Sequence, residues 1–125
     1  MSPLDDAGRI ETLVHRWDAQ TALGRPAAVD ADLAADGVAE VVDVMLPRQM
    51  ALGRQSALAF ALELRDGEGS WVIGSGERAV LTAPAADLLL LLWKRRTLGD
   101  LLSAGAVLTG PQATAETVLA AALTP

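Results

Sequence analysis

Residues 56–82 read SALAFALELRDGEGSWVIGSGERAVLT, and this stretch carries the clearest secondary-structure pattern in the chain. Large apolar residues alternate with small or charged ones over its first part, at Leu58, Phe60, Leu62 and Leu64. A period of two residues is typical of a strand with one buried face. The sequence therefore predicts a strand over residues 58–64.

Two glycine-rich segments follow this strand, at residues 66–70 and 74–77, and each precedes a short apolar run, at 71–73 and 79–82. Turns this short usually join neighbouring antiparallel strands. We therefore expect an antiparallel meander, with residues 106–109 as a further strand. Neither glycine-rich segment has the strand-to-helix context of a phosphate-binding loop, so hairpin turns are the preferred interpretation.

A helix is predicted before the strands, over residues 5–23. Its apolar residues recur at helical spacing on one stripe, at Ile10, Leu13, Val14, Trp17 and Thr21. Gly24 and Pro26 follow the stripe and are typical of a helix end. A second helix is predicted over residues 32–46, closed by Pro47, because proline interrupts helical hydrogen bonding.

Two more helices are predicted after the strands. Pro84 suits the first turn of a helix that runs to about Arg96, and the run Leu88–Leu92 makes this helix apolar on nearly every side. Gly110 and Pro111 precede a last helix with an apolar inner face made of Ala115, Val118, Leu119 and Ala122. The apolar helix is expected to be the central buried one.

The predicted fold is α+β, with an antiparallel meander of three to five strands and helices packed mainly on one of its faces. One isolated helix precedes this unit, and a boundary is expected between residues 24 and 29. The 125 residues, of which 51% are hydrophobic, are enough for one domain with a core and too few for two ordinary domains.

Composition excludes several classes of function. The net charge of −6 argues against nucleic acid or an anionic membrane as the main partner, because both require a basic face. The lack of cysteine excludes disulfides, thiolate metal sites and cysteine nucleophiles. The acidic N-terminus is unlike a signal peptide, and the apolar run Leu88–Trp93 is too short to span a bilayer. A cytoplasmic location is expected.

The single histidine, His15, lies four residues after Glu11. Side chains at i and i+4 project from one helix face, so this carboxylate and imidazole are placed to share a metal ion. Asp18 lies three residues further along, as a further ligand or as a hydrogen-bond partner of the bound histidine. Two ligands make an incomplete zinc site, and a solvated helix face explains the same spacing.

The sequence evidence for other catalytic or binding sites is weaker. Ser56, Ser70, Ser75 and Ser103 have only His15 as a potential base, and none lies in a nucleophile elbow, so a hydrolase triad is not expected. The basic residues 94–96 end the third predicted helix, where positive charge complements the helix dipole. The Leu88–Trp93 run is compatible with a lipid tunnel or with a core helix.

Several segments occur together in a suggestive order. ETLVHRWDAQ at residues 11–20 is followed by ALGRP at 22–26 and LAADGVAE at 33–40, and AADLLLLLWKR stands at 85–95. This series resembles the mycothiol-dependent maleylpyruvate isomerase family over essentially the whole chain.

The resemblance implies two parts. Residues 1–25 match the last helix of a DinB-like bundle, which in the family holds a divalent metal, usually zinc, through His, Glu and His. Residues 26–125 match a small α+β domain that resembles sterol carrier proteins. The resemblance makes Glu11 and His15 two of the three metal ligands, and the third, a histidine on an earlier helix, has no counterpart in this chain. The mycothiol pocket of the complete enzyme would also be largely missing.

Three functional hypotheses follow. The preferred one is a stand-alone or truncated C-terminal domain, inactive alone and without catalytic residues or cofactors of its own, that serves as a binding or dimerisation module. The second is a part of an active enzyme that uses zinc and mycothiol and is completed by another chain. The third is a carrier of a small hydrophobic ligand such as a lipid.

The first helix also suggests a partner. In a complete family member its stripe, with Leu13, Val14 and Trp17, would be buried against other bundle helices. Without them the helix must fray, fold back on its own domain or pair with a second copy. We expect pairing in a homodimer, since a symmetric contact lets one apolar patch bury itself.

Overall fold

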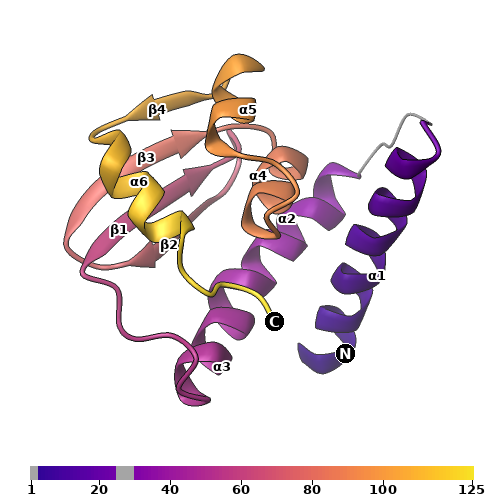
Figure 1. The fold of residues 1–125 in the computed structure, drawn as a ribbon, viewed down its shortest axis with the longest axis horizontal. Coiled ribbons are helices and arrows are strands. Elements are labelled where there is room, and N and C mark those ends of the chain that lie inside the picture. The colour runs from indigo at the N-terminus through magenta and orange to yellow at the C-terminus, as the bar shows by residue number, and fades with distance from the viewer. Residues whose placement is uncertain (1–2, 25–29) are drawn as a thin grey trace.

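The computed structural model describes residues 3–24 and 30–125, so most of the expected boundary at 24–29 lies outside the described residues. Figure 1 shows a sheet with helices on one side of it and the N-terminal helix at the edge of the molecule. The elements, in chain order, are α1 (Pro3–Ala22), α2 (Ala31–Glu40), the π-helical turn η1 (Val41–Met45), α3 (Leu46–Ala51), β1 (Phe60–Arg65), β2 (Ser70–Gly74), β3 (Glu77–Thr82), α4 (Ala85–Leu92), α5 (Leu98–Ser103), β4 (Val107–Thr109) and α6 (Gln112–Leu119).

The α+β class is confirmed, but the expected meander is wrong. The four strands lie in the order β2-β1-β3-β4. β1 pairs with β2 and β3 pairs with β4 in antiparallel fashion, whereas β1 and β3 run parallel. The second and third strands therefore do not form a hairpin with each other; they lie on opposite sides of β1.

The link between β2 and β3 explains this arrangement. Strands on either side of a third are about 10 Å apart, and three Cα steps span about the same distance. Gly74 and Gly76 have positive φ angles of 81° and 101°. A Cβ on Gly74 would lie 2.1 Å from the carbonyl oxygen of Phe60, and one on Gly76 would lie 2.3 Å from that of Ala59. Only glycine lets the link pass so close to the start of β1.

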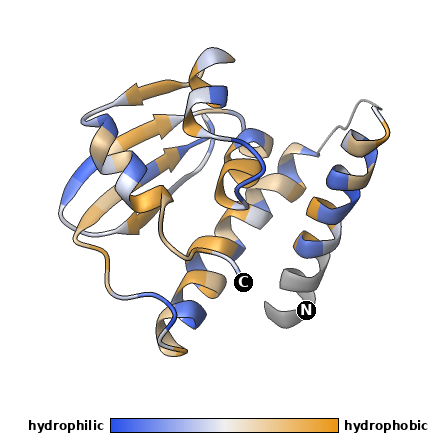
Figure 2. Cartoon of the chain, in the orientation of Figure 1, coloured by the Kyte–Doolittle hydropathy of each residue, from blue (hydrophilic) through white to orange (hydrophobic). Residues whose placement is uncertain are grey.

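One face of the sheet is covered by helices, as predicted. Its buried side chains belong to one cluster with those of α4 and α6, and on the strands they are Leu62, Leu64, Ile73, Ala79 and Leu81. The other face is polar at its centre, where Glu63 accepts hydrogen bonds from Arg65 and, at 2.8 Å, from Arg78. Figure 2 shows the strands largely apolar and the segment after α4 hydrophilic.

The helix that was expected to end at Pro47 continues to Ala51. The wider turn η1 ends two residues before Pro47, and the backbone N–H of Leu46 donates to the carbonyl of Val41, five residues back. Proline has no N–H to donate and its ring crowds the preceding turn of an α-helix. The π-helical turn accommodates both effects, so the helix passes through the proline.

The helix expected to run to Arg96 ends at Leu92. Lys94 has a positive φ of 59°, its N–H donates to the carbonyl of Leu91, and the N–H of Arg95 donates to that of Leu90. This is the Schellman termination, with lysine in the place that glycine usually takes. The short helix α5, which was not predicted, then begins at a capping box between Thr97 and Asp100.

The helix α1 folds back on its own domain. Ile10 and Val14 are each 1% exposed, Leu13 and Trp17 are half-buried, and the helix contacts α2. Gly37 of α2 allows this close approach, since a Cβ there would lie 2.9 Å from Leu89 and 3.1 Å from Ile10. No helix within the described residues is both long and apolar enough to cross a membrane.

Candidate functional site

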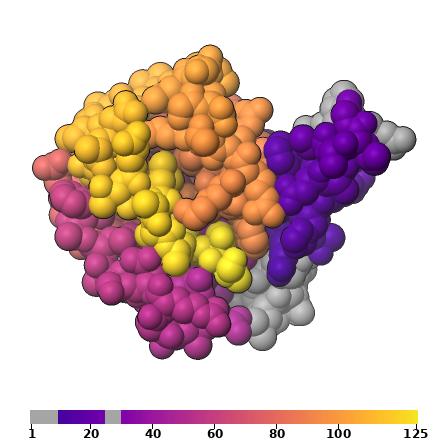
Figure 3. Space-filling view, in the orientation of Figure 1, coloured from indigo at the N-terminus to yellow at the C-terminus, as the bar shows by residue number. Residues whose placement is uncertain are grey.

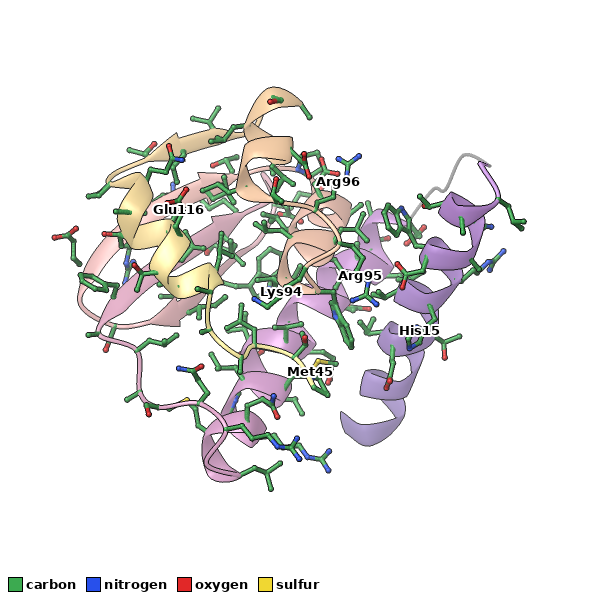
Figure 4. The ribbon with its side chains drawn as sticks, in the orientation of Figure 1. His15, Met45, Lys94, Arg95, Arg96 and Glu116 are labelled. Carbon is green, nitrogen blue, oxygen red and sulfur yellow. The ribbon has the colours of Figure 1, made fainter. Side chains whose placement is uncertain are left out.

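The structure brings Glu11 and His15 together on α1. The distance from Nε2 of His15 to Oε1 of Glu11 is 3.7 Å, and their side chains are 64% and 55% exposed, respectively. The helical spacing explains the approach, because residues four apart lie one turn above each other. Figure 4 shows His15 midway along α1. Both side chains are thus largely exposed to solvent, and His15 is not part of a buried site.

Asp18 is held by a different partner. Its carboxylate accepts hydrogen bonds from Nε of Arg95 at 3.1 and 3.2 Å and from Nη2 of Arg95 at 2.9 Å. This two-pronged hydrogen bonding lowers the pKa of Asp18, with smaller contributions from the charges of Arg95 and His15. Asp18 therefore ties α1 to the segment after α4, seventy-seven residues along the chain.

The pair does not fit a complete zinc site. A structural or catalytic zinc needs at least three protein ligands. Across residues 3–24 and 30–125, no group of three or more His, Cys, Asp or Glu side chains could hold a metal ion. No chemical step is therefore assigned to a metal on Glu11 and His15.

The basic residues after α4 contact three helices, and Figure 4 shows Lys94 near the end of α6 and Arg95 toward α1. Nζ of Lys94 donates to the carbonyl of Leu119 at the end of α6, at 2.7 Å. Arg95 binds Asp18 of α1, and Arg96 donates to Asp87 in the first turn of α4 at 3.2 Å. The expected role at a helix C-terminus is met for α4, where Nη1 of Arg95 donates to the carbonyl of the C-cap residue Trp93 at 2.8 Å, and Lys94 plays the same role for α6.

The first glycine-rich segment, residues 66–70, is a turn as expected. Oδ1 of Asp66 accepts hydrogen bonds from the backbone N–H groups of Glu68 and Gly69, at 2.9 and 2.6 Å. These hydrogen bonds lower the pKa of Asp66, and the bond from Gly69 makes the largest contribution. The turn thus satisfies its own N–H groups, which leaves them unavailable to a phosphate.

A cavity of about 320 Å³, which the sequence did not suggest, lies between α1, η1, α3 and the C-terminal segment. Its lining side chains are Glu11, Val44, Met45, Arg48, Gln49, Leu52, Arg54 and Pro125. The buried Gln49 donates to the carbonyl of Thr124 at 2.9 Å and accepts from Arg54 at 3.3 Å. Figure 3 shows the C-terminal segment, in yellow, lying against the helical region of α3.

The comparison with family models gives one match. The model described as the MDMPI C-terminal domain matches residues 32–117, which is more than half of the chain. The matched region runs from α2 to α6 and leaves α1 outside. No curated protein and no solved structure matches the chain.

Proposed function

Because the chain belongs to the family of the MDMPI C-terminal domain, we propose that it is a non-catalytic binding module of a mycothiol-dependent maleylpyruvate isomerase-like protein. The observation that carries the proposal is the solvent exposure of the Glu11–His15 pair. Both side chains are more than half exposed, and the carboxylate nearest along the helix, that of Asp18, is engaged by Arg95.

The physical argument is that two ligands on one exposed helix bind zinc weakly. Water competes for every open coordination position, and within the described residues no hydrogen bond from another element fixes the two side chains. A catalytic zinc must also polarise substrate in a site that excludes water, and a solvent-facing pair offers no such enclosure.

The experiment measures isomerisation of maleylpyruvate by the purified chain in the presence of mycothiol and zinc. We expect no turnover above that of the His15→Ala variant, and weak zinc binding in a calorimetric titration. The Arg16→Gln variant, altered at an exposed position one residue away, is the matched control for surface changes on α1. Turnover that His15→Ala abolishes and Arg16→Gln preserves would contradict the proposal.

A second candidate is an enzyme completed by another chain. The same exposure supports it, since Glu11 and His15 face outward, where a partner could add the third ligand. Under this hypothesis, activity appears only on mixing with a chain that supplies bundle helices, and it is lost in the His15→Ala variant. Zinc and mycothiol would then act in the assembled protein.

Homodimer formation through α1 and a cytoplasmic location remain predictions. Val14 is already buried within the chain, so a dimer contact would use the half-buried Leu13 and Trp17. Sedimentation of the wild type against Trp17→Asp tests the dimer, and equal monomeric behaviour would contradict it.

The lipid-carrier hypothesis depends on the apolar run Leu88–Leu92. The side chains of this run belong to the core cluster, except that of Leu90, which is also buried.

A further inference from the structure

The cavity beside α3 is separate from the basic segment after α4 and does not include His15. It forms because the C-terminal segment folds back over α3, where Gln49 holds the carbonyl of Thr124. Gln49 is 6% exposed, so this connection is a fixed part of the cavity wall rather than a surface contact. The cavity has the size of a site for a small organic molecule.

The lining of the cavity is amphipathic. Val44, Met45 and Leu52 supply apolar surface, and Arg48 and Arg54 supply two guanidinium groups. Arg54 is oriented by its hydrogen bond to Oε1 of Gln49, at 3.3 Å. A planar guanidinium fixed beside apolar surface is suited to a carboxylate that carries a hydrocarbon body.

Arg48 makes no hydrogen bond or ion pair with the residues that the structure describes. Its five N–H donors are therefore available to a ligand. The third charged residue of the lining, Glu11, lies 3.7 Å from the imidazole of His15. Among the described side chains of the lining, two guanidinium groups therefore lie with one carboxylate.

We propose that this cavity binds a small organic monocarboxylate with a short unbranched apolar chain. Arg48 and Arg54 would hold the carboxylate, and Val44, Met45 and Leu52 would contact the chain. Glu11 would disfavour a second negative charge, which selects monocarboxylates over dicarboxylates. This ligand site does not depend on the absence of catalysis and would stand if the chain were half of an enzyme.

The experiment uses sodium octanoate as the probe, with binding followed by amide chemical shifts in ¹⁵N-labelled full-length chain. We expect saturable shifts centred on the amides of Val44, Gln49 and Leu52. Octanol, which has a similar chain and no charge, and acetate, which has the charge and almost no chain, should each bind more weakly. Succinate tests the discrimination against dicarboxylates and should also bind more weakly.

Two substitutions at the cavity should act in opposite directions. Arg48→Gln removes a guanidinium that has no partner to lose and should weaken octanoate binding by about three- to tenfold. Glu11→Gln removes repulsion and should strengthen it by about two- to fivefold. Arg16→Gln, which changes the net charge by the same amount as Arg48→Gln at a position outside the lining, should leave the affinity unchanged.

The proposal is overturned if millimolar octanoate gives no saturable shifts, or if octanol binds as tightly as octanoate. It is equally overturned if Arg48→Gln and Arg16→Gln weaken binding by the same factor, because the effect would then come from net charge alone. Zinc and mycothiol are left out of these titrations, so their outcome is distinct from that of the isomerase assay.

Discussion

The helices α1 and α4 belong to the same chain, yet they are held in different ways. α4 is short, and its residues Leu88–Leu92 are all buried, with exposed fractions of 5% or less. α1 has 20 residues, and among its described side chains only Ile10 and Val14 are buried. The longer helix is therefore the less embedded one.

The difference shows that the length of a helix is a poor guide to its place in the cooperative unit. A helix is stabilised mainly by the apolar surface that it buries against other elements. α4 lies inside the matched family domain and contributes to its core, whereas α1 lies outside the match and is fastened by one stripe and the Asp18–Arg95 pair. We expect α1 to open locally at a lower free energy than the rest.

The largest effect is expected for Leu88→Ala in α4. Leu88 is completely buried, and truncation of such a leucine costs about 2–5 kcal/mol through lost transfer free energy and the cavity left behind. Urea denaturation followed by circular dichroism measures the loss. If Leu88→Ala lowers the free energy of unfolding by less than a substitution of a buried α1 residue does, the ranking of the two helices is wrong.

A smaller effect is expected for Ile10→Ala in α1. The side chain is buried, but the helix can detach without unfolding the domain, so we expect a global loss of about 1–2 kcal/mol. Hydrogen exchange should show faster exchange confined to α1. If instead the amides of α4 exchange faster by the same factor, the two helices form one cooperative unit and the comparison fails.

The Asp18–Arg95 pair should contribute about 1 kcal/mol or less, since both side chains are about one-third exposed. Because the pair lowers the pKa of Asp18 below 3.8, its contribution is complete above that pH and is lost as the pH falls through the lowered value. Stability measured from neutral to acidic pH should therefore fall more in the wild type than in Asp18→Asn over that range. Parallel curves would show that the pair does not hold α1.

The smallest effect is expected for Leu23→Ala, just after α1. Leu23 is 69% exposed, and substitutions at such positions usually change stability by less than about 0.5 kcal/mol. The same denaturation experiment measures it, beside Ile10→Ala. A clear loss would indicate that Leu23 is covered in solution, as it would be in an α1-mediated dimer.

Much of the fold could be predicted from periodicity, because the spacing of apolar residues indicates which face of a helix or strand is buried. The helix α1, the strand β1 and the burial of Leu88–Leu92 followed from such patterns. The place of β3 did not, because residues 74–77 look the same in sequence whether they turn back beside β2 or cross β1. Thr97 and Asp100 have the spacing of a capping box, which is a local sequence signal for the start of α5.

The candidate site was less accessible to sequence reasoning. The i, i+4 relation of Glu11 and His15 is local and was predicted. The capture of Asp18 by Arg95 joins residues far apart in the chain, and the same is true of Gln49 and Thr124 at the cavity. Contacts of this kind depend on how elements pack, which a single sequence does not encode in any repeating pattern.

The link between β2 and β3 also sets an order for assembling the sheet. β3 has no hairpin partner of its own, so it gains strand hydrogen bonds only after β1 is present beside it. The β1–β2 hairpin can form first from neighbouring residues, and β3 then joins β1 from the other side without a long loop to close. The centre of the sheet is thus formed by segments close in sequence, which favours rapid folding. β4 can pair with β3 only after α4 and α5, which lie between them in the chain, have packed.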